Sequence, residues 1–124
     1  QIRILWVDDH PQNNDAEIEY FEQQQIAVYK VTSSKDALAL LNMYQYQLII
    51  SDMGRNDNPL AGLHLVETIR KAGISTPYII YTIMPSEAQK KIALSYGANA
   101  VAVDKTELFY FADQQLNPPG TPSQ

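Results

Sequence analysis

The amino-acid sequence predicts an α/β fold in which helices cover both faces of a parallel β-sheet. Five short apolar runs of strand length alternate with five stretches in which apolar residues recur at helical spacing. The runs are almost continuously apolar, which is typical of strands that are buried on both faces. Because a helix separates each run from the next, neighbouring strands can point the same way, and the sheet is expected to be parallel.

The five predicted strands end at polar or turn-forming residues. They cover residues 2–7, 26–31, 48–52, 78–81 and 99–103. Right-handed crossovers between parallel strands lead either to an open, doubly wound sheet or to a closed barrel of eight units, and five units are too few for the barrel. We therefore expect a flavodoxin-like doubly wound sheet with the strand order 2-1-3-4-5. Its switch point would lie between the first and third strands.

The five predicted helices begin at capping signals or prolines. Pro11 suits the first turn of a helix that runs to about Gln24. The expected caps of later helices are Ser33, Ser86 and Thr106, and the expected stops are Gly73 and Gly97. The residues expected on the inner faces are, helix by helix, Ala16, Tyr20 and Phe21; Ala37, Leu40, Leu41 and Tyr44; Gly62, Leu65, Val66 and Ile69; Ala88, Ile92, Ala93 and Tyr96; and Leu108, Phe111, Ala112 and Leu116.

The 124-residue chain has the length of a single domain. We expect residues 1–116 to form this domain and the proline-rich stretch 117–124 to be a flexible C-terminal tail or linker. Because the sequence starts at Gln1 without a methionine, we also expect a trimmed chain or a piece of a longer protein.

Charge and composition argue against several classes of function. Nine Lys and Arg residues against fourteen Asp and Glu residues give a net charge of −5, so the domain is not expected to bind nucleic acid directly. The absence of cysteine rules out disulfides and thiolate metal sites and is typical of a reducing compartment. No apolar run approaches the roughly 20 residues of a membrane span, and no signal-peptide pattern opens the chain. A cytoplasmic location without membrane contact is therefore expected.

Several predicted strands end in residues that can carry chemistry. These residues are Asp8 and Asp9, Asp52, Thr82 and Lys105. The carboxyl ends of parallel strands share one edge of the sheet, where ligands of such folds bind. Crowded carboxylates repel each other, and a divalent cation would remove that cost. An all-oxygen site favours Mg²⁺ or Mn²⁺, and a free carboxylate beside such an ion suggests phosphoryl transfer to an aspartate nucleophile.

Each of these residues also has a purely structural interpretation. The Asp8-Asp9 pair fits a turn or a helix cap, and Lys105 could merely face Asp104 or a helix end. Their joint occurrence at the ends of the right strands favours a site over separate structural roles. His10 and His64 have no partners at metal-binding spacing in the sequence and are interpreted as surface or loop residues.

Four sequence motifs, taken as an ordered set, resemble the receiver domain of bacterial two-component response regulators. They are ILWVDDHP at residues 4–11, LIISDM at 48–53, IIYT at 79–82, and the stretch from Gly97-Ala98 to Lys105. The resemblance covers residues 2–116. It implies a phosphorylation-controlled signalling switch in a phosphorelay, with at most slow autodephosphorylation as enzymatic activity.

The resemblance also assigns roles to the strand-end residues. Asp52 would be the phosphoacceptor and would receive its phosphoryl group from a histidine kinase, a phosphotransfer protein or a small phosphodonor. Asp9 would bind Mg²⁺ directly and Asp8 through water, with Asp52 and the backbone carbonyl of Gly54 as further ligands. Thr82 would be the switch hydroxyl and Lys105 the lysine that pairs with the phosphoryl group. The output partner or attached effector domain is left open.

The sequence departs from the usual pattern of the family at several positions. The family usually has methionine and proline shortly after the phosphoacceptor, whereas Gly54-Arg55-Asn56 stands here, in a loop about two residues longer. Thr106 replaces the usual proline after Lys105. Ala102 stands where the family has an aromatic switch residue, so the usual coupling of that aromatic to Thr82 cannot operate in its familiar form.

Two other functions are compatible with parts of the sequence. The altered loop and the missing aromatic are compatible with a receiver-like interaction module that does not use phosphorylation. An aspartate-nucleophile phosphatase of the haloacid dehalogenase kind would carry an Asp-x-Asp pattern after the first strand, and here the third position is His10.

Overall fold

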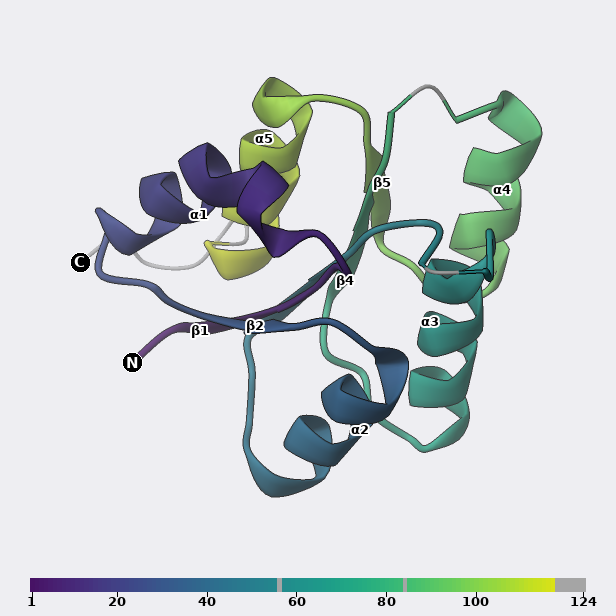
Figure 1. Cartoon of the computed structure of the whole chain (residues 1–124), viewed down its shortest axis with the longest axis horizontal. Coiled ribbons are helices and arrows are strands. Elements are labelled where there is room, and N and C mark those ends of the chain that lie inside the picture. Colours follow the sequence, from purple (N-terminus) through teal and green to yellow (C-terminus); the bar gives the residue numbers. More distant parts are fainter. Residues whose placement is uncertain (56, 84, 118–124) are drawn as a thin grey trace.

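The fold is a central five-stranded sheet with helices on both faces, seen in a computed structural model that describes residues 1–55, 57–83 and 85–117 (Figure 1). The elements are β1 (Arg3–Val7), the 3₁₀ helix η1 (Pro11–Asn14), α1 (Asp15–Glu22), β2 (Ala27–Val31), α2 (Ser34–Met43), β3 (Leu48–Ser51), α3 (Ala61–Lys71), β4 (Tyr78–Tyr81), α4 (Glu87–Ser95), β5 (Ala100–Ala102) and α5 (Lys105–Leu116).

All strand pairs in the sheet are parallel, and the order is β2-β1-β3-β4-β5. This confirms the predicted flavodoxin-like fold, with β1 and β3 side by side at the switch point. Helices α1 and α5 cover one face of the sheet, and α2, α3 and α4 cover the other (Figure 1).

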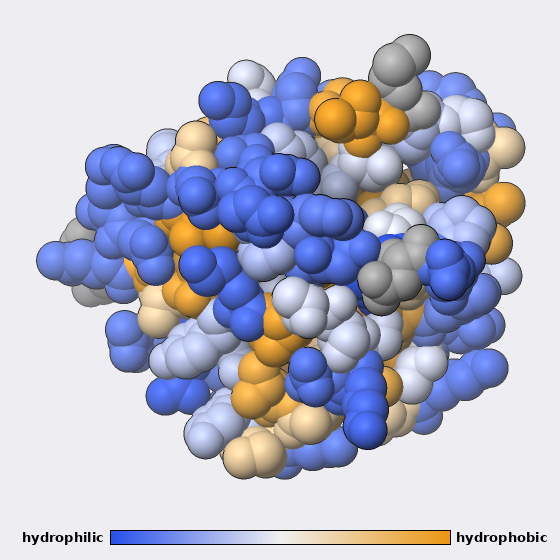
Figure 2. All heavy atoms as spheres, in the orientation of Figure 1, coloured by the Kyte–Doolittle hydropathy of each residue, from blue (hydrophilic) through white to orange (hydrophobic). Residues whose placement is uncertain are grey.

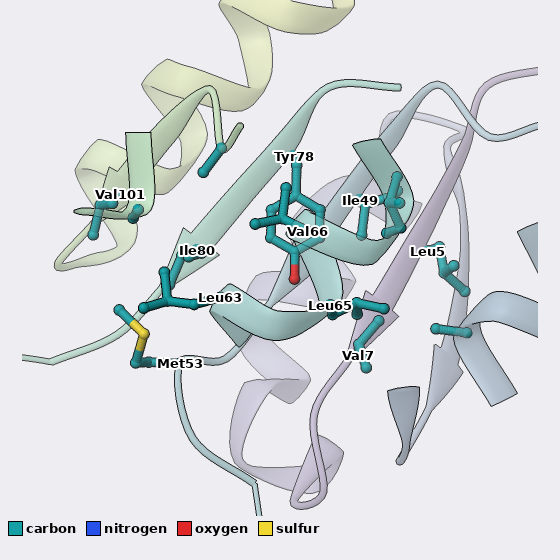
Figure 3. Packing of buried hydrophobic residues seen from close by; sticks show 14 of the residues in the cluster. Leu5, Val7, Ile49, Met53, Leu63, Leu65, Val66, Tyr78, Ile80 and Val101 are labelled. Atoms are coloured by element: carbon teal, nitrogen blue, oxygen red, sulfur yellow. The ribbon is translucent and has the colours of Figure 1, made fainter. Parts of the chain in front are cut away.

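The alternation of side chains along each strand divides the core into two layers. Leu5, Val7 and Ile49 point into the layer beneath α2, α3 and α4, part of which is shown in Figure 3. Trp6 and Ile50 point the other way, toward α1 and α5. Fully burying one such side chain contributes about 1.5–3 kcal/mol, so the two layers together hold the strand ends in place.

The structure corrects the predicted inner faces of α1 and α4. Ala16 and Tyr20 are exposed, and Ile18 and Phe21 form the core side of α1. The α-helix begins only at Asp15, after the 3₁₀ helix η1, so the side of the helix that faces the sheet differs from the predicted one. In α4 only Ala93 is buried; the predicted core residues Ala88, Ile92 and Tyr96 are exposed. The helix rests on the sheet through a narrow contact.

The predicted helix boundaries are partly correct. Ser33 and Ser86 cap α2 and α4 as expected, the latter in a complete capping box with Gln89. The prediction that Thr106 caps the last helix is wrong. The Asp104 carboxylate accepts a hydrogen bond from the Glu107 amide and caps α5, so Thr106 lies inside the helix. An earlier capping residue takes precedence because its carboxylate already satisfies a free amide of the first turn.

Hydrophilic residues dominate the face in Figure 2, with hydrophobic residues interspersed among them. Within the described ranges, none of the helices has the length and apolar character needed to cross a membrane. Of the predicted tail 117–124, only Asn117, the C-terminal cap of α5, belongs to the described residues.

Candidate functional site

An open hollow of about 420 Å³ lies at the carboxyl edge of the sheet, above the switch point. Its lining residues are Asp8, Asn13, Asn14, Glu17, Asp52, Met53, Gly54, Tyr81, Thr82 and Ile83. Acidic and hydroxyl groups from the segments that follow β1, β3 and β4 therefore meet the amide groups of η1 and the carboxylate of Glu17 in α1, as the strand order requires. Four of the predicted site residues, Asp8, Asp52, Gly54 and Thr82, are among them.

The backbone around Asp52 is held from both sides. The Asp52 amide donates to the Val7 carbonyl at 3.1 Å, and the Gly62 amide donates to the Met53 carbonyl at 2.7 Å. The α3 helix approaches so closely that a Cβ atom at Gly62 would lie 2.2 Å from the Asp52 carbonyl oxygen. Glycine is therefore required there, and the end of β3 has little freedom to move.

The two carboxylate oxygens of Asp52 have different surroundings. Oδ1 accepts a hydrogen bond from the Arg55 guanidinium at 2.5 Å, within an ion pair in which the Asp52 side chain is only 13% exposed. Oδ2 is buried and has no hydrogen-bond partner among the residues that the structure describes. One oxygen is thus fixed, while the other retains its full capacity to accept a bond.

Arg55 is itself buried, with 4% of its surface exposed. Its guanidinium also donates to Ser51 Oγ at 2.9 Å and Ser34 Oγ at 2.5 Å, with a longer contact of 3.4 Å to the Ala61 carbonyl. The backbone of Arg55 forms a short antiparallel bridge with Asn58, which turns the loop back toward the sheet. This turn places a long cationic side chain inward instead of in solvent.

Burial raises the pKa of Asp52 to about 7, because desolvation penalises the charged carboxylate. The charge and hydrogen bond of Arg55 oppose this effect, and the negative charges of Asp8 and Asp9 add to it. The acid is therefore divided between its protonated and charged forms near neutral pH. A second positive charge in the hollow would favour the charged form.

Asp8, Asp9 and His10 place ligand atoms within 4.8 Å of one another at the end of β1. Asp8 Oδ2 accepts from Asn14 at 2.9 Å, Asp8 Oδ1 accepts from the His10 amide at 2.7 Å, and Asp9 Oδ1 lies 3.1 Å from His10 Nδ1. His10 is exposed as predicted, but the interpretation that it lacks partners at metal-binding spacing is wrong.

The oxygen chemistry of this edge fits a hard divalent cation. Carboxylates from Asp8, Asp9 and Asp52 and the backbone carbonyl of Gly54 are the groups that could hold it, and this set of oxygen donors is the kind that Mg²⁺ prefers.

The chain matches the family of response regulator receiver domains over residues 4–107. It belongs to that family. Receiver domains are signalling domains rather than enzymes; they generally bind Mg²⁺ at an acidic pocket and work with a histidine kinase or phosphotransfer protein.

Individual relatives are distant in sequence but close in fold. The receiver domain of the Francisella response regulator 1452 is 25% identical, with a TM-score of 0.82 over 93% of this chain and 96% of that one. A two-component response regulator from Clostridium difficile is 18% identical, with a TM-score of 0.85 over 98% of this chain and all of that one, which shows the fold alone. The methanol utilization control regulatory protein MoxX of Paracoccus denitrificans is 24% identical over 101 residues, which make up 81% of this chain and 45% of that protein. The chain thus spans less than half of that relative.

Two predicted site residues, Lys105 and Asp9, are not among the described residues that line the hollow. Lys105 opens α5 with an exposed side chain. Asp9 contributes to the acidic cluster rather than to the lining. Thr82 lines the hollow, and its amide donates to the Ala102 carbonyl at 3.0 Å, which couples the end of β4 to β5.

Two residues that shape the site, Arg55 and Glu17, were not predicted as site residues. The sequence predicts that Arg55, in the loop after the third strand, can reach an anion, but not that it pairs with Asp52, although a basic residue three positions after a strand-end aspartate is a usable signal. Glu17 is buried in the hollow and accepts from the Tyr81 hydroxyl at 2.9 Å. Nothing in the spacing of α1 distinguishes Glu17 from its exposed neighbours.

The raised pKa of Asp52 predicts a measurable pH dependence of stability. Between its ordinary value of 3.8 and about 7, the folded state retains a proton that the unfolded state releases, so stability falls as pH rises through this window. Asp52→Asn does not titrate. The free energies of unfolding of the wild type and of Asp52→Asn are compared at pH 4 and pH 8 in the presence of a chelator. Over this range the value of the wild type should fall, relative to that of the variant, by on the order of 2 kcal/mol once solvent screening is allowed for. Parallel curves from denaturant titrations of the two proteins would contradict this.

Proposed function

We propose that this receiver domain accepts a phosphoryl group on Asp52, from a histidine kinase or a small phosphodonor, in a Mg²⁺-dependent reaction. The observation that carries the proposal is the unpartnered Oδ2 of a buried carboxylate on the wall of an open acidic hollow. A buried acceptor without a hydrogen bond costs free energy, and sites that retain such a cost are commonly functional.

Each lining group then has a definite task. Asp8, Asp9 and the Gly54 carbonyl would hold the cation, with Mn²⁺ as the alternative ion. When bound, the ion would neutralise charge on the phosphoryl oxygens. The Thr82 hydroxyl would donate to a phosphoryl oxygen, and Lys105 would swing in from the first turn of α5 to pair with the product, because a long exposed lysine can reorient at little cost.

The domain would transmit its state to an output partner or an attached effector domain. The length of MoxX leaves room for such a domain in that relative. We propose a cytoplasmic location and no direct nucleic-acid contact by this domain, on the basis of its net charge of −5.

One specific observation favours the phosphorylation-independent interaction module as a second candidate. The Arg55 guanidinium already pairs with one oxygen of Asp52, so the carboxylate has a cationic partner within the domain without a phosphoryl group or a metal ion. The phosphatase has no comparable support, since the third position of its pattern is the exposed His10.

Labelling by acetyl phosphate tests the proposed acceptor. With Mg²⁺ present, intact-mass spectrometry should detect one added phosphoryl group on the wild type and none on Asp52→Asn, because the amide lacks the nucleophilic oxygen anion. Asp104→Asn is the matched control, since this aspartate caps α5 and lies outside the hollow lining. Equal labelling of wild type and Asp52→Asn would rule out the assignment, and an unlabelled wild type would favour the phosphorylation-independent module.

The route of the conformational switch gives a second prediction. Ala102 is fully buried and has no side-chain torsion to rotate, so we expect little movement near it when Asp52 is phosphorylated. The movement is expected instead in residues 53–61 and at Thr82. Residue 56 of that loop lies outside the described residues. Backbone amide shifts with and without beryllium fluoride, a phosphoryl mimic, should be largest in that loop and at Thr82. Larger shifts in residues 100–111, with residues 53–61 unchanged, would show that the signal travels through β5 and α5 instead.

A further inference from the structure

We propose that Arg55 is a positioning residue of the phosphoacceptor site: its buried guanidinium fixes one oxygen of Asp52 so that the other attacks the phosphodonor. This inference rests on the proposed function and adds to it a cation that belongs to the loop after β3. It gives Arg55 a role before and during transfer, distinct from the role proposed for Lys105 in the product.

The guanidinium is anchored like a part of the core. Its donors reach Ser51 at the end of β3, Ser34 in the first turn of α2 and the carbonyl of Ala61 at the start of α3. Its side chain is only 3% exposed. Three separate elements therefore fix the position of this cation, whereas a solvent-exposed lysine would lose side-chain entropy to hold the same place.

The anchoring selects the reacting oxygen. Arg55 donates to Oδ1 of Asp52, and Oδ2 has no partner within the described structure. In the transfer step a lone pair of Oδ2 forms the new O–P bond. With acetyl phosphate as donor, the P–O bond to the acetyl group breaks, and its electron pair leaves on acetate. Oδ1 becomes the carbonyl oxygen of the acyl phosphate and can keep its hydrogen bond to Arg55.

The charge distribution shows why a fixed cation is needed. The hollow is lined by the acids Asp8, Glu17 and Asp52, and among its described lining residues there is no lysine or arginine. Arg55 is not among these lining residues, and its guanidinium pairs with Oδ1 of Asp52 while Ser51 and Ser34 anchor it. A cation held at Oδ1 offsets part of the negative charge that these acids place around the reacting carboxylate.

The test compares rates of labelling by acetyl phosphate at saturating Mg²⁺, measured by intact mass and expressed per folded protein. Arg55→Gln should slow labelling at least about tenfold, because it removes a charge-assisted hydrogen bond to the reacting carboxylate. Arg55→Lys should recover a large part of the rate, since it restores the charge without the full set of anchors. Ser34→Ala, which removes one anchor and leaves both partners intact, should slow labelling about threefold.

Arg70→Gln is the matched control. Arg70 is also a partly buried arginine with four hydrogen bonds, but it serves the opposite edge of the sheet, where it donates to the carbonyls of Gly97, Ile74 and Thr76 and to Asn99 Oδ1. Its loss should lower the melting temperature and leave the labelling rate per folded protein unchanged.

The possible outcomes separate this inference from the proposed function. If Arg55→Gln melts earlier but is labelled at the wild-type rate, Arg55 is only structural and the inference fails, while Asp52 stays the acceptor. If Arg55→Gln does not fold, Ser34→Ala decides, and a wild-type rate in that variant overturns the inference. A wild type that gains no phosphoryl mass overturns the proposed function, and the inference with it.

Discussion

The burial of the Asp52 carboxylate beside Arg55 is the constraint on which the rest of the site depends. The carboxylate lies at the end of β3, at the switch point of the sheet, where α3 packs so closely that Gly62 must lack a side chain. Tyr78, fully buried on β4, adds a hydrogen bond from its hydroxyl to the Gly62 carbonyl at 2.8 Å. The Asp52 side chain is therefore held in a buried position next to its neighbours, and its negative charge must be offset by groups at that position.

Two opposing effects set the state of this acid. Desolvation and the nearby acids favour the proton, whereas Arg55 favours the charge. Desolvation outweighs Arg55 and brings the pKa to about 7, so the charge of the acid near neutral pH responds strongly to any added charge, whether from a cation or from a phosphoryl group. Because Arg55 also contacts Ser34 of α2 and Ala61 of α3, a change at Asp52 reaches both helices through one side chain. The loop after β3 thus offers a route to the surface that does not need an aromatic residue on β5.

The sequence predicted the strands and their order because these depend on repeated local patterns. Buried runs ending in Asp8 and Asp52 mark both the sheet and its carboxyl edge. Helix faces were less predictable: α4 has apolar residues on all sides, and only packing shows that Ala93 is the buried one. Arg55 was missed as a site residue because its role arises from a turn that directs a normally exposed side chain inward, and Glu17 because burial of a carboxylate depends on a distant tyrosine hydroxyl.

The coupling between Asp52 and Arg55 is the quantity that tests this account most directly. It is obtained from the free energies of unfolding of the wild type, Asp52→Asn, Arg55→Gln and the double variant, measured by denaturant titration at pH 8 in a chelator. A buried, charge-assisted pair predicts a favourable coupling of about 1.5 kcal/mol or more. A coupling below about 0.5 kcal/mol, the level at which independent sites add, would show that Arg55 does not balance the charge of Asp52 and would contradict the account.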